Sequence, residues 1–215
     1  MKKSYHRHKS IAVKIQVQLI AAAVLTAIAS IATAITIFQK AFIDNSIVGL
    51  ERTANGITQE LKTSEIAVMN YASLFAASPG MDSWAVSDLR NIASSLSLGV
   101  LAVLDKDGRV IASSDSRLPR GFDAKGAYEC VEKSRSGSPV SQFGASDFSA
   151  FGITASCISP SRDFFVLAGL NLAGEGWTKN VKDVYSVECT LFLNNVRADT
   201  TLTGENGRTL IGTRQ

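Results

Sequence analysis

Residues 19–38, LIAAAVLTAIASIATAITIF, form an apolar run without a charged residue, a proline or a glycine. At 1.5 Å per residue, a helix over this run would be about 30 Å long, the thickness of the hydrocarbon core of a bilayer. Hydroxyl side chains within the run, such as Thr26 and Thr36, fit such a helix because they can hydrogen-bond to a carbonyl one turn earlier. The run therefore predicts a transmembrane helix.

Basic residues cluster in the tail 1–18 and are sparse just after residue 38, which predicts a cytoplasmic N-terminus and an extracytoplasmic C-terminal part. No second apolar run of similar length follows, so we expect a single-pass protein of the inner (cytoplasmic) membrane. Two alternatives fit less well. A cleaved signal peptide has a shorter hydrophobic region of about 7–15 residues, although 32–34 resembles a cleavage site. A buried core helix is rarely apolar on every face.

The net charge of +3 comes from the first 40 residues, mainly from the tail. The first 40 residues carry six Lys or Arg and no Asp or Glu, whereas the rest of the chain carries 16 Lys or Arg against 19 Asp or Glu. The part outside the membrane therefore has no basic surplus for a polyanion, and we expect no nucleic-acid partner.

Beyond the run, apolar or small residues recur at alternating spacings of four and three from Ile43 through Ile47, Leu50 and Val68 to Phe75. This spacing predicts a long helix over 40–78, which Pro79-Gly80 ends. The helix would either lie on its own domain, or in addition pair through its membrane-proximal half with a second copy. We favour the second interpretation, a homodimer through the long helix.

After this helix the chain alternates short helical stretches with strands that are separated by turn residues. The first hairpin turns at 105–108, where Gly108 suits a positive φ, and the last hairpin turns at Asn194-Asn195. The expected fold class is α+β, with an antiparallel sheet. The expected helices are 84–96, 127–135 and 177–185, and the expected strands are 99–104, 109–113, 151–158, 164–172, 188–193 and 197–202.

Two segments resemble the Cache sensory domains of bacterial receptors. GVLAVLDKDGRVIASSDS at 99–116 is similar to the strand–DxxG–strand opening of a Cache sheet, and NVKDVYSVECTLFLNNVRADTTLTGENGRTLIGT at 180–213 is similar to the start of the second module of a double Cache. The resemblance covers about residues 12–215 and implies a PAS-like antiparallel sheet. It divides the chain into the tail 1–18, the transmembrane helix 19–38, two helices in 39–98, a first module sheet in 99–175, and the truncated start of a second module in 176–215.

What the resemblance implies is the small-molecule sensing portion of a membrane signal-transduction receptor, and we expect a methyl-accepting chemotaxis protein. The sensor portion of a histidine kinase or of a cyclic-dinucleotide enzyme remains an alternative. The family's second module would continue past Gln215, which implies a fragment of a longer receptor or a truncated reading frame. A non-sensing alternative is a single-span envelope protein that assembles through its long helix and has no ligand pocket.

Candidate ligand-binding residues lie in the region, expected to be irregular, between the first hairpin and the strand at 151–158. The guanidinium groups of Arg117 and Arg120 would bind a carboxylate, and Asp147 would meet an amine. Aromatic side chains would wall the site, as ligand pockets require. These are Tyr128, Phe143, Phe148 and Phe151. The competing interpretation is that the arginines are solvated loop charges and the aromatics belong to the core.

The sequence predicts no enzyme, no catalytic residue, no metal site and no cofactor. The histidines, His6 and His8, lie in the tail, and the chain has no Gly-x-Ser-x-Gly elbow, phosphate-binding glycine loop or Cys-x-x-Cys motif. Of the possible states of Cys130, Cys157 and Cys189, we favour three buried free thiols. One disulfide with a free thiol, or a bridge between two chains, stays open.

Overall fold

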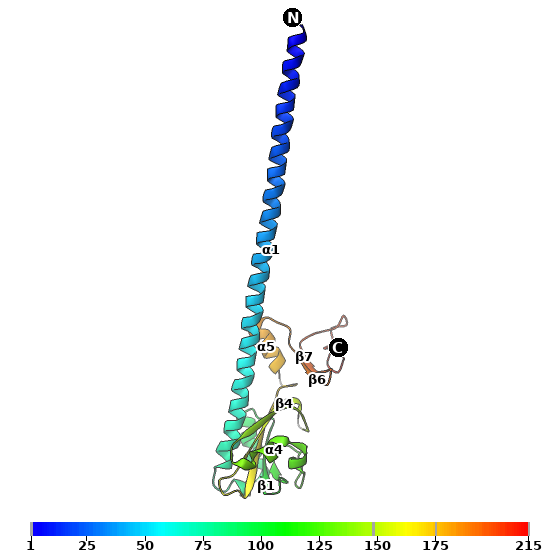
Figure 1. Ribbon diagram of the computed structural model, residues 1–215. Helices are drawn as coiled ribbons and strands as arrows, with labels where there is room; N and C mark the ends of the chain where they lie inside the picture. The colour runs from blue at the N-terminus through cyan, green and yellow to red at the C-terminus, as the bar shows by residue number, and fades with distance from the viewer. Residues whose placement is uncertain (1, 148, 175, 215) are drawn as a thin grey trace. The chain divides into compact units, whose positions relative to one another are not determined.

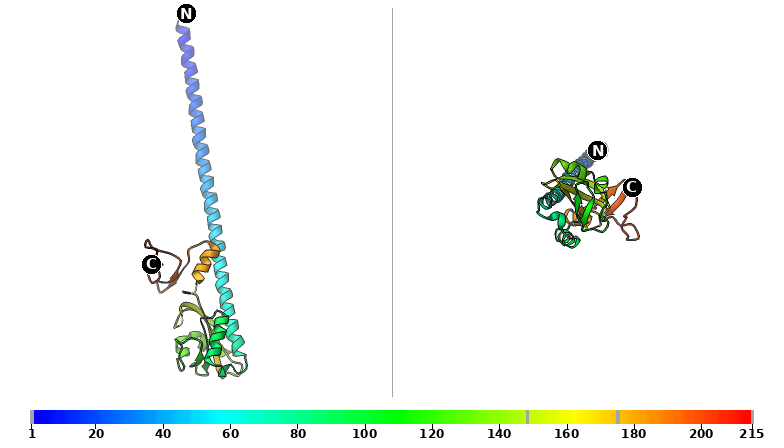
Figure 2. Two further views of the ribbon diagram at one scale, coloured as in Figure 1. Left: turned by 180° about the vertical axis from the view of Figure 1, so that it is seen from behind. Right: turned by 90° about the horizontal axis from the view of Figure 1, so that it is seen from below.

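The computed structural model describes residues 2–147, 149–174 and 176–214. The chain forms two compact units, Met1–Asn55 and Gly56–Gln215. The long helix α1 (Lys2–Ala76) supplies all of the first unit and the beginning of the second. An antiparallel sheet with short helices completes the second unit (Figures 1 and 2). This arrangement confirms the expected α+β fold class.

In the first unit, α1 carries exposed apolar side chains along the expected membrane-spanning run, including Leu19, Leu25 and Phe38. The hydroxyl groups of Thr26, Thr33 and Thr36 donate to the carbonyl four residues earlier at 2.8–2.9 Å, so none of them presents an unsatisfied donor. Within the described residues, α1 is the one helix long and apolar enough to cross a membrane. It fits a single-pass membrane protein.

In the second unit, the last turns of α1 pack on the sheet. Val68, Ala72 and Phe75 are buried in its core, whereas Ile43 and Leu50 of the first unit are exposed. The C-terminal part of the predicted seam therefore lies on its own domain, and pairing of the N-terminal part with a second copy stays a prediction. The helix ends at Ala76, shortly before Pro79 and Gly80.

The sheet has five strands in the order β2-β1-β5-β4-β3, and each neighbouring pair is antiparallel. β1 and β5 therefore lie inside the sheet, which explains why nearly every position in both is apolar. Gly108 turns the β1–β2 hairpin with φ 84°, as the sequence predicts. The strands are β1 (Val100–Asp105), β2 (Val110–Ser113), β3 (Val140–Ser146), β4 (Ser149–Ile158) and β5 (Phe164–Asn171).

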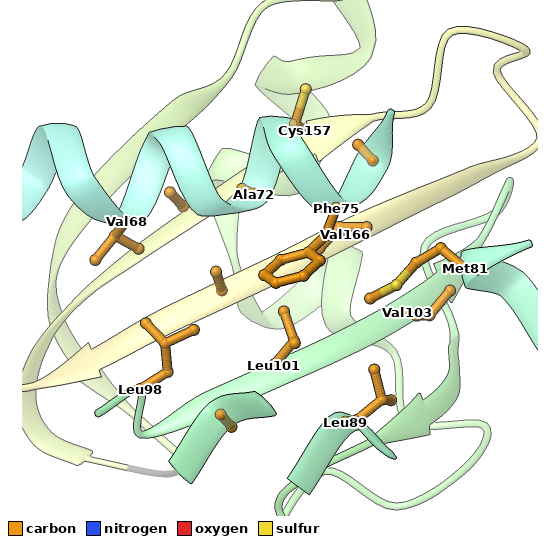
Figure 3. Close-up of a cluster of buried hydrophobic side chains, with 14 of the residues drawn as sticks. Val68, Ala72, Phe75, Met81, Leu89, Leu98, Leu101, Val103, Cys157 and Val166 are labelled. Carbon is orange, nitrogen blue, oxygen red and sulfur yellow. The ribbon is translucent and has the colours of Figure 1, made fainter. Parts of the chain in front are cut away.

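Helices cover both faces of the sheet, so the second unit has two cores. The alternating side chains of β1 divide between them, because successive residues of a strand point to opposite faces. Leu101 and Val103 pack with α1 and with Leu89 of α2 (Val86–Ser95) (Figure 3). Val100, Ala102 and Leu104 pack against α3 (Ala124–Ala127) and α4 (Glu129–Lys133). We call these the α1 side and the α4 side of the sheet.

Two sequence expectations in this region are wrong. The expected helix 127–135 is interrupted at Tyr128, which is extended with φ −125°, so α3 ends before it and α4 begins after it. The region between β2 and β4 is not wholly irregular, because β3 lies within it as an edge strand. Two short 3-10 helices complete the unit, Met81–Ser83 and Ser134–Ser136.

The three cysteines are free thiols. Cys130 is buried on the α4 side and Cys157 on the α1 side, so the sheet separates them. Their burial agrees with the favoured interpretation as small apolar residues, whereas Cys189 is only half-buried. Burial raises the pKa of the Cys130 thiol to about 12.

The C-terminal segment begins with α5 (Trp177–Tyr185), followed by the hairpin of β6 (Thr190–Leu193) and β7 (Val196–Thr200), which forms a separate two-stranded sheet. All three elements were expected from the sequence. Asn194 and Asn195 turn the hairpin with φ 48° and 68°, the positive values that a tight hairpin turn requires. The Asp199 carboxylate accepts from Gly174 N and Thr178 Oγ1, both at 3.0 Å, and so ties β7 to the start of α5.

Candidate functional site

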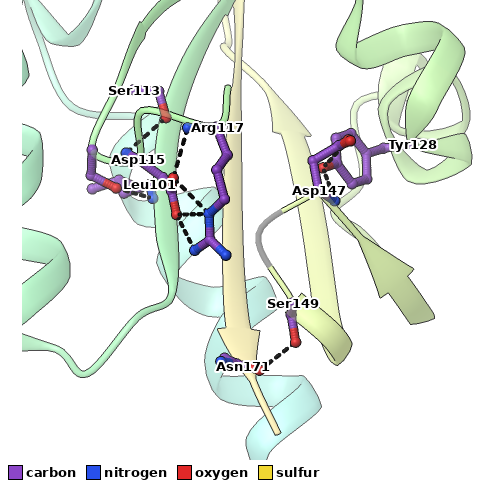
Figure 4. Close-up of polar contacts among 9 residues, drawn as sticks. Leu101, Ser113, Asp115, Arg117, Tyr128, Asp147, Ser149 and Asn171 are labelled. Carbon is purple, nitrogen blue, oxygen red and sulfur yellow. Dashed lines mark hydrogen bonds and ion pairs between the residues drawn. The ribbon is translucent and has the colours of Figure 1, made fainter. Parts of the chain in front are cut away.

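Arg117 is held by Asp115 in the loop that follows β2. Its Nε donates to both carboxylate oxygens of Asp115, at 3.0 and 3.1 Å, and its Nη2 donates to Oδ2 at 2.6 Å (Figure 4). These hydrogen bonds hold the pKa of the Asp115 carboxyl below its usual range. Leu118, the next residue, is buried on the α4 side. The Arg117 side chain is 57% exposed, so a solvent-borne anion can reach a guanidinium whose direction is already fixed.

A second polar pair joins Tyr128 to Asp147. The Tyr128 ring is buried on the α4 side, while its hydroxyl donates to Asp147 Oδ2 at 3.1 Å and accepts from Asp147 N at 3.3 Å (Figure 4). Burial raises the pKa of Tyr128 well above its usual range, so the hydroxyl stays protonated. Tyr128 can take this position because the chain is extended there, between α3 and α4. The pair fixes the end of β3 over the α4 side.

Between these two pairs, the α4 side of the sheet carries glycines, whereas β1 and β5 place larger residues such as Leu104, Phe165 and Leu167 on the same face. Gly144 of β3 pairs with Gly152 of β4, and Gly169 of β5 pairs with Val100 and Thr154. Gly144 has φ 153°, and a Cβ on Gly152 would lie 2.5 Å from the Leu170 carbonyl oxygen. Glycine within strands marks a place where a ligand or another backbone approaches closely. We call Gly144, Gly152 and Gly169 the glycine floor.

The polar groups beside this floor include a pair that the sequence did not single out. Ser149 Oγ donates to Asn171 Oδ1 across the ends of β4 and β5 (Figure 4). Ser149 and Thr154 are both buried. Hydrogen bonds between buried groups are stronger than hydrogen bonds in water, so these hydroxyl groups can orient a small molecule that binds over the floor. The only signal in the sequence is that glycines and hydroxyl residues replace large apolar ones in β4.

A hollow of about 440 Å³ adjoins the same loop on the side of α2. Asp115, Ser114 and Ser116 line it from the loop, and Arg90 lines it from α2. Arg90 therefore adds a second guanidinium near the Asp115–Arg117 pair. Sequence reasoning did not single out Arg90, because one exposed arginine on a short helix has no distinguishing spacing.

The sequence-predicted site residues do not form a single group. Arg117, Tyr128 and Asp147 belong to the polar pairs described above. Phe143 pairs in register with Ile153, whose side chain is in the α1-side core, and Phe151 packs against the same core. The two phenylalanines therefore lie on the face opposite Tyr128 and do not wall the same site. Arg120 is exposed. Phe148 lies outside the described residues.

Chemically, the α4 side offers a fixed guanidinium, a carboxylate and a neutral phenol around a floor without side chains. Such a set can bind a small molecule that carries a carboxylate or an amine. It contains no nucleophile paired with a base, so it shows no arrangement for covalent catalysis among the described residues.

No protein-family model and no curated protein sequence matches the chain. Among solved structures, it is similar to the sensor domain of the V. cholerae histidine kinase DctB, with 13% identity and a TM-score of 0.51 over 76% of this chain and 68% of that chain. It also matches the extracellular domain of rpHK1S-Z16, a protein named as a histidine kinase, with 16% identity and a TM-score of 0.41 over 74% and 68%. Over the matched part, the chain therefore shares the fold of the DctB sensor domain.

Proposed function

We propose that the chain is the extracytoplasmic small-molecule sensing portion of a membrane signal-transduction receptor. The observation that carries the proposal is the α4 side of the sheet, where a glycine floor lies between the Asp115–Arg117 and Tyr128–Asp147 pairs. The fold shared with a histidine kinase sensor domain supports it. Sensor domains bind ligands rather than transform them, and we propose that this domain is not an enzyme.

The apolar run of α1 supports a single-pass location in the inner membrane, with the second unit outside the cytoplasm. The proposed segments are the tail 1–18, the transmembrane helix 19–38, two helices in 39–98, a sensing module in 99–175, and the start of a second module in 176–215. The separate β6–β7 sheet supports the last of these. Exposed Ile43 and Leu50 support a homodimer through the long helix.

The ligand we propose is a small molecule with a carboxylate. Arg117 is oriented by Asp115 and reaches solvent, which suits it to bind an anionic oxygen pair. Asp147, held by Tyr128, would meet an amine where the ligand carries one. Arg120 is exposed and close in sequence to Arg117, so we keep it as a further contributor. Phe143 and Phe151 lie on the opposite face of the sheet, so we do not include them in the proposed site.

For the output, a methyl-accepting chemotaxis receptor remains our first proposal, and the sensor portion of a histidine kinase is the second. The second proposal is supported by the similar solved structure, which is the sensor domain of a histidine kinase. The coding sequence downstream would decide between them. Long seven-residue repeats rich in Glu and Gln would indicate chemotaxis, whereas a kinase domain would indicate a histidine kinase.

The test is thermal unfolding of the full chain in lipid nanodiscs, with amino acids, organic acids, polyamines and purines added one at a time. A compound that binds only the folded state stabilises it by about 2.7 kcal/mol at a hundredfold excess over its dissociation constant. We expect a dose-dependent rise of the midpoint with a carboxylate compound. Arg117→Ala should abolish the rise, whereas Arg208→Ala, which removes an exposed arginine from the C-terminal turn, should retain it.

Two outcomes contradict the proposal. If no compound shifts the midpoint of a folded sample, the chain does not sense these ligands. If Arg117→Ala and Tyr128→Phe both leave the shift unchanged, the α4 side is not the site. Loss of the shift in Arg90→Ala alone would place the ligand in the hollow beside α2.

A further inference from the structure

Helix α5 is attached to the end of β5 by a short connection. Leu172 and Ala173, which follow β5, are both buried, and their amides both donate to the Phe151 carbonyl at 3.0 Å. The two hydrogen bonds of Asp199 then tie Gly174 and the start of α5 to β7. The C-terminal end of β5 also carries Asn171, which bonds to Ser149 beside the glycine floor. Hydrogen bonds therefore hold both the end of β5 and the start of α5.

The other end of α5 contacts α1. Figures 1 and 2 show α5 alongside α1. Tyr185, the last residue of α5, lies so close to Gly56 that a Cβ there would be 2.7 Å from its Cε1 and 2.8 Å from its hydroxyl oxygen. One turn further along α1, Glu60 Oε1 accepts from Asn180 Nδ2 at 3.3 Å. Residues four apart share one helix face, so Gly56 and Glu60 form one contact surface for α5.

Gly56 is costly in the middle of a helix, where glycine is about 1 kcal/mol less favourable than alanine. The Tyr185 ring occupies the space that a methyl group would need. Carbon atoms attract best at about 3.5–4.0 Å, so a Cβ at 2.7 Å would force the ring away. Gly49, seven residues earlier in α1, has no atom within 4 Å of the same position. The two glycines therefore differ in their contact with α5.

We propose that Tyr185 is a latch that holds α5 on α1 at Gly56, so that a displacement of the C-terminal end of β5 passes through α5 to α1. This inference deepens the proposed sensing function, on which its regulatory meaning rests. α1 is the helix that enters the membrane in that proposal, and β5 carries Gly169 and Asn171 of the candidate site. Packed side chains between rigid helices and strands can carry coupling from one site to another.

The first test compares Gly56→Ala with its matched control Gly49→Ala, by amide hydrogen exchange of the full chain in nanodiscs. Both substitutions raise helix propensity equally, and only the first displaces Tyr185. Gly56→Ala should make exchange in residues 177–185 about fivefold faster, the ratio expected from a loss of about 1 kcal/mol in local stability. Gly49→Ala should leave it unchanged. Equal exchange in the two variants would overturn the latch.

A double-mutant cycle identifies the contact responsible. In a Tyr185→Ala background, the ring that Gly56→Ala displaces is absent, so the second substitution should add no further acceleration. If Gly56→Ala still accelerates exchange in α5 by the same factor, the effect arises elsewhere and the latch is refuted.

Transmission is tested without a ligand by Ser149→Ala, which removes the hydrogen bond from Ser149 to Asn171 at the end of β5. Exchange in both α5 and residues 52–60 of α1 should accelerate, and Tyr185→Ala should abolish the response in α1. A response confined to α5 would overturn transmission. These arms need no ligand, so their failure leaves the proposed sensing function standing, and the absence of a ligand in the nanodisc screen leaves the latch measurable.

Discussion

Because the Cys130 thiol is buried, the free energy of unfolding of the second unit should decrease at alkaline pH. Its thiol lies in the α4-side core, and burial raises its pKa from 9.0 to about 12. The unfolded chain therefore loses this proton at a lower pH than the folded chain does. A group that binds its proton more tightly when folded contributes stability that is full below the unfolded pKa and is lost as pH rises towards the folded pKa.

Between pH 8 and pH 10 the unfolded thiol becomes mostly ionised, while the folded thiol stays protonated. Linkage then gives a loss of about 1.4 kcal/mol in the free energy of unfolding, close to one pKa unit. The assay is urea unfolding of the full chain at pH 8 and pH 10, followed by tryptophan fluorescence. Cys130→Ala removes the titrating group, so its loss between the two pH values should be smaller by about 1.4 kcal/mol.

The pKa values of Cys157 and Cys189 are also raised by burial, and both residues titrate in the wild-type chain and in Cys130→Ala. Their contributions therefore cancel in the comparison. Equal losses in the two proteins would refute the reasoning, because they would show that the Cys130 thiol is accessible to hydroxide in the folded state.

Two further substitutions test the core and the attachment of α5 to β7. Leu101 lies in the middle of the α1-side core, so Leu101→Ala should lower the free energy of unfolding in urea by about 2–5 kcal/mol. Leu74 is 61% exposed, so Leu74→Ala should change it by less than about 0.5 kcal/mol. Equal losses in the two variants would contradict the packing of Leu101 in this core. Asp199→Ala should cost about 1–3 kcal/mol, because it removes the carboxylate that accepts from Gly174 N and from the buried Thr178 hydroxyl. The amides of α5 should also exchange faster. Unchanged exchange in 177–185 would show that Asp199 does not hold the helix.

The sequence predicts those elements whose local chemistry is decisive. Gly108 and the pair Asn194-Asn195 mark hairpin turns because few other residues accept positive φ. β3 was missed for the opposite reason. Its sequence, VSQFGAS, is short of bulky β-formers and contains Gly144, so its pairing with β4 supplies what propensity lacks. The interruption at Tyr128 arises from its hydrogen bonds to Asp147, which is 19 residues away.

The candidate site was predicted in part for a similar reason. Arg117, Tyr128 and Asp147 were chosen for their chemistry, and the structure shows two of them, Tyr128 and Asp147, bonded to each other. Phe143 and Phe151 were assigned to the same site, although the face of each depends on the register of β3 and β4. A one-residue change of register reverses every face, and sequence without pairing information does not fix it.

The burial of both faces of β5 affects how the register of this sheet is determined. In β5, Leu167 points to the α4 side and Ala168 to the α1 side, and both are buried. In a sheet with one solvent-exposed face, a register shift of one residue would expose apolar side chains to water, which is unfavourable. Here a slip would exchange one buried face for the other at little hydrophobic cost. Correct alignment must come from side-chain volume and from the turn 159–163, so an insertion of one residue in that turn would place Ala168 over the α4 side.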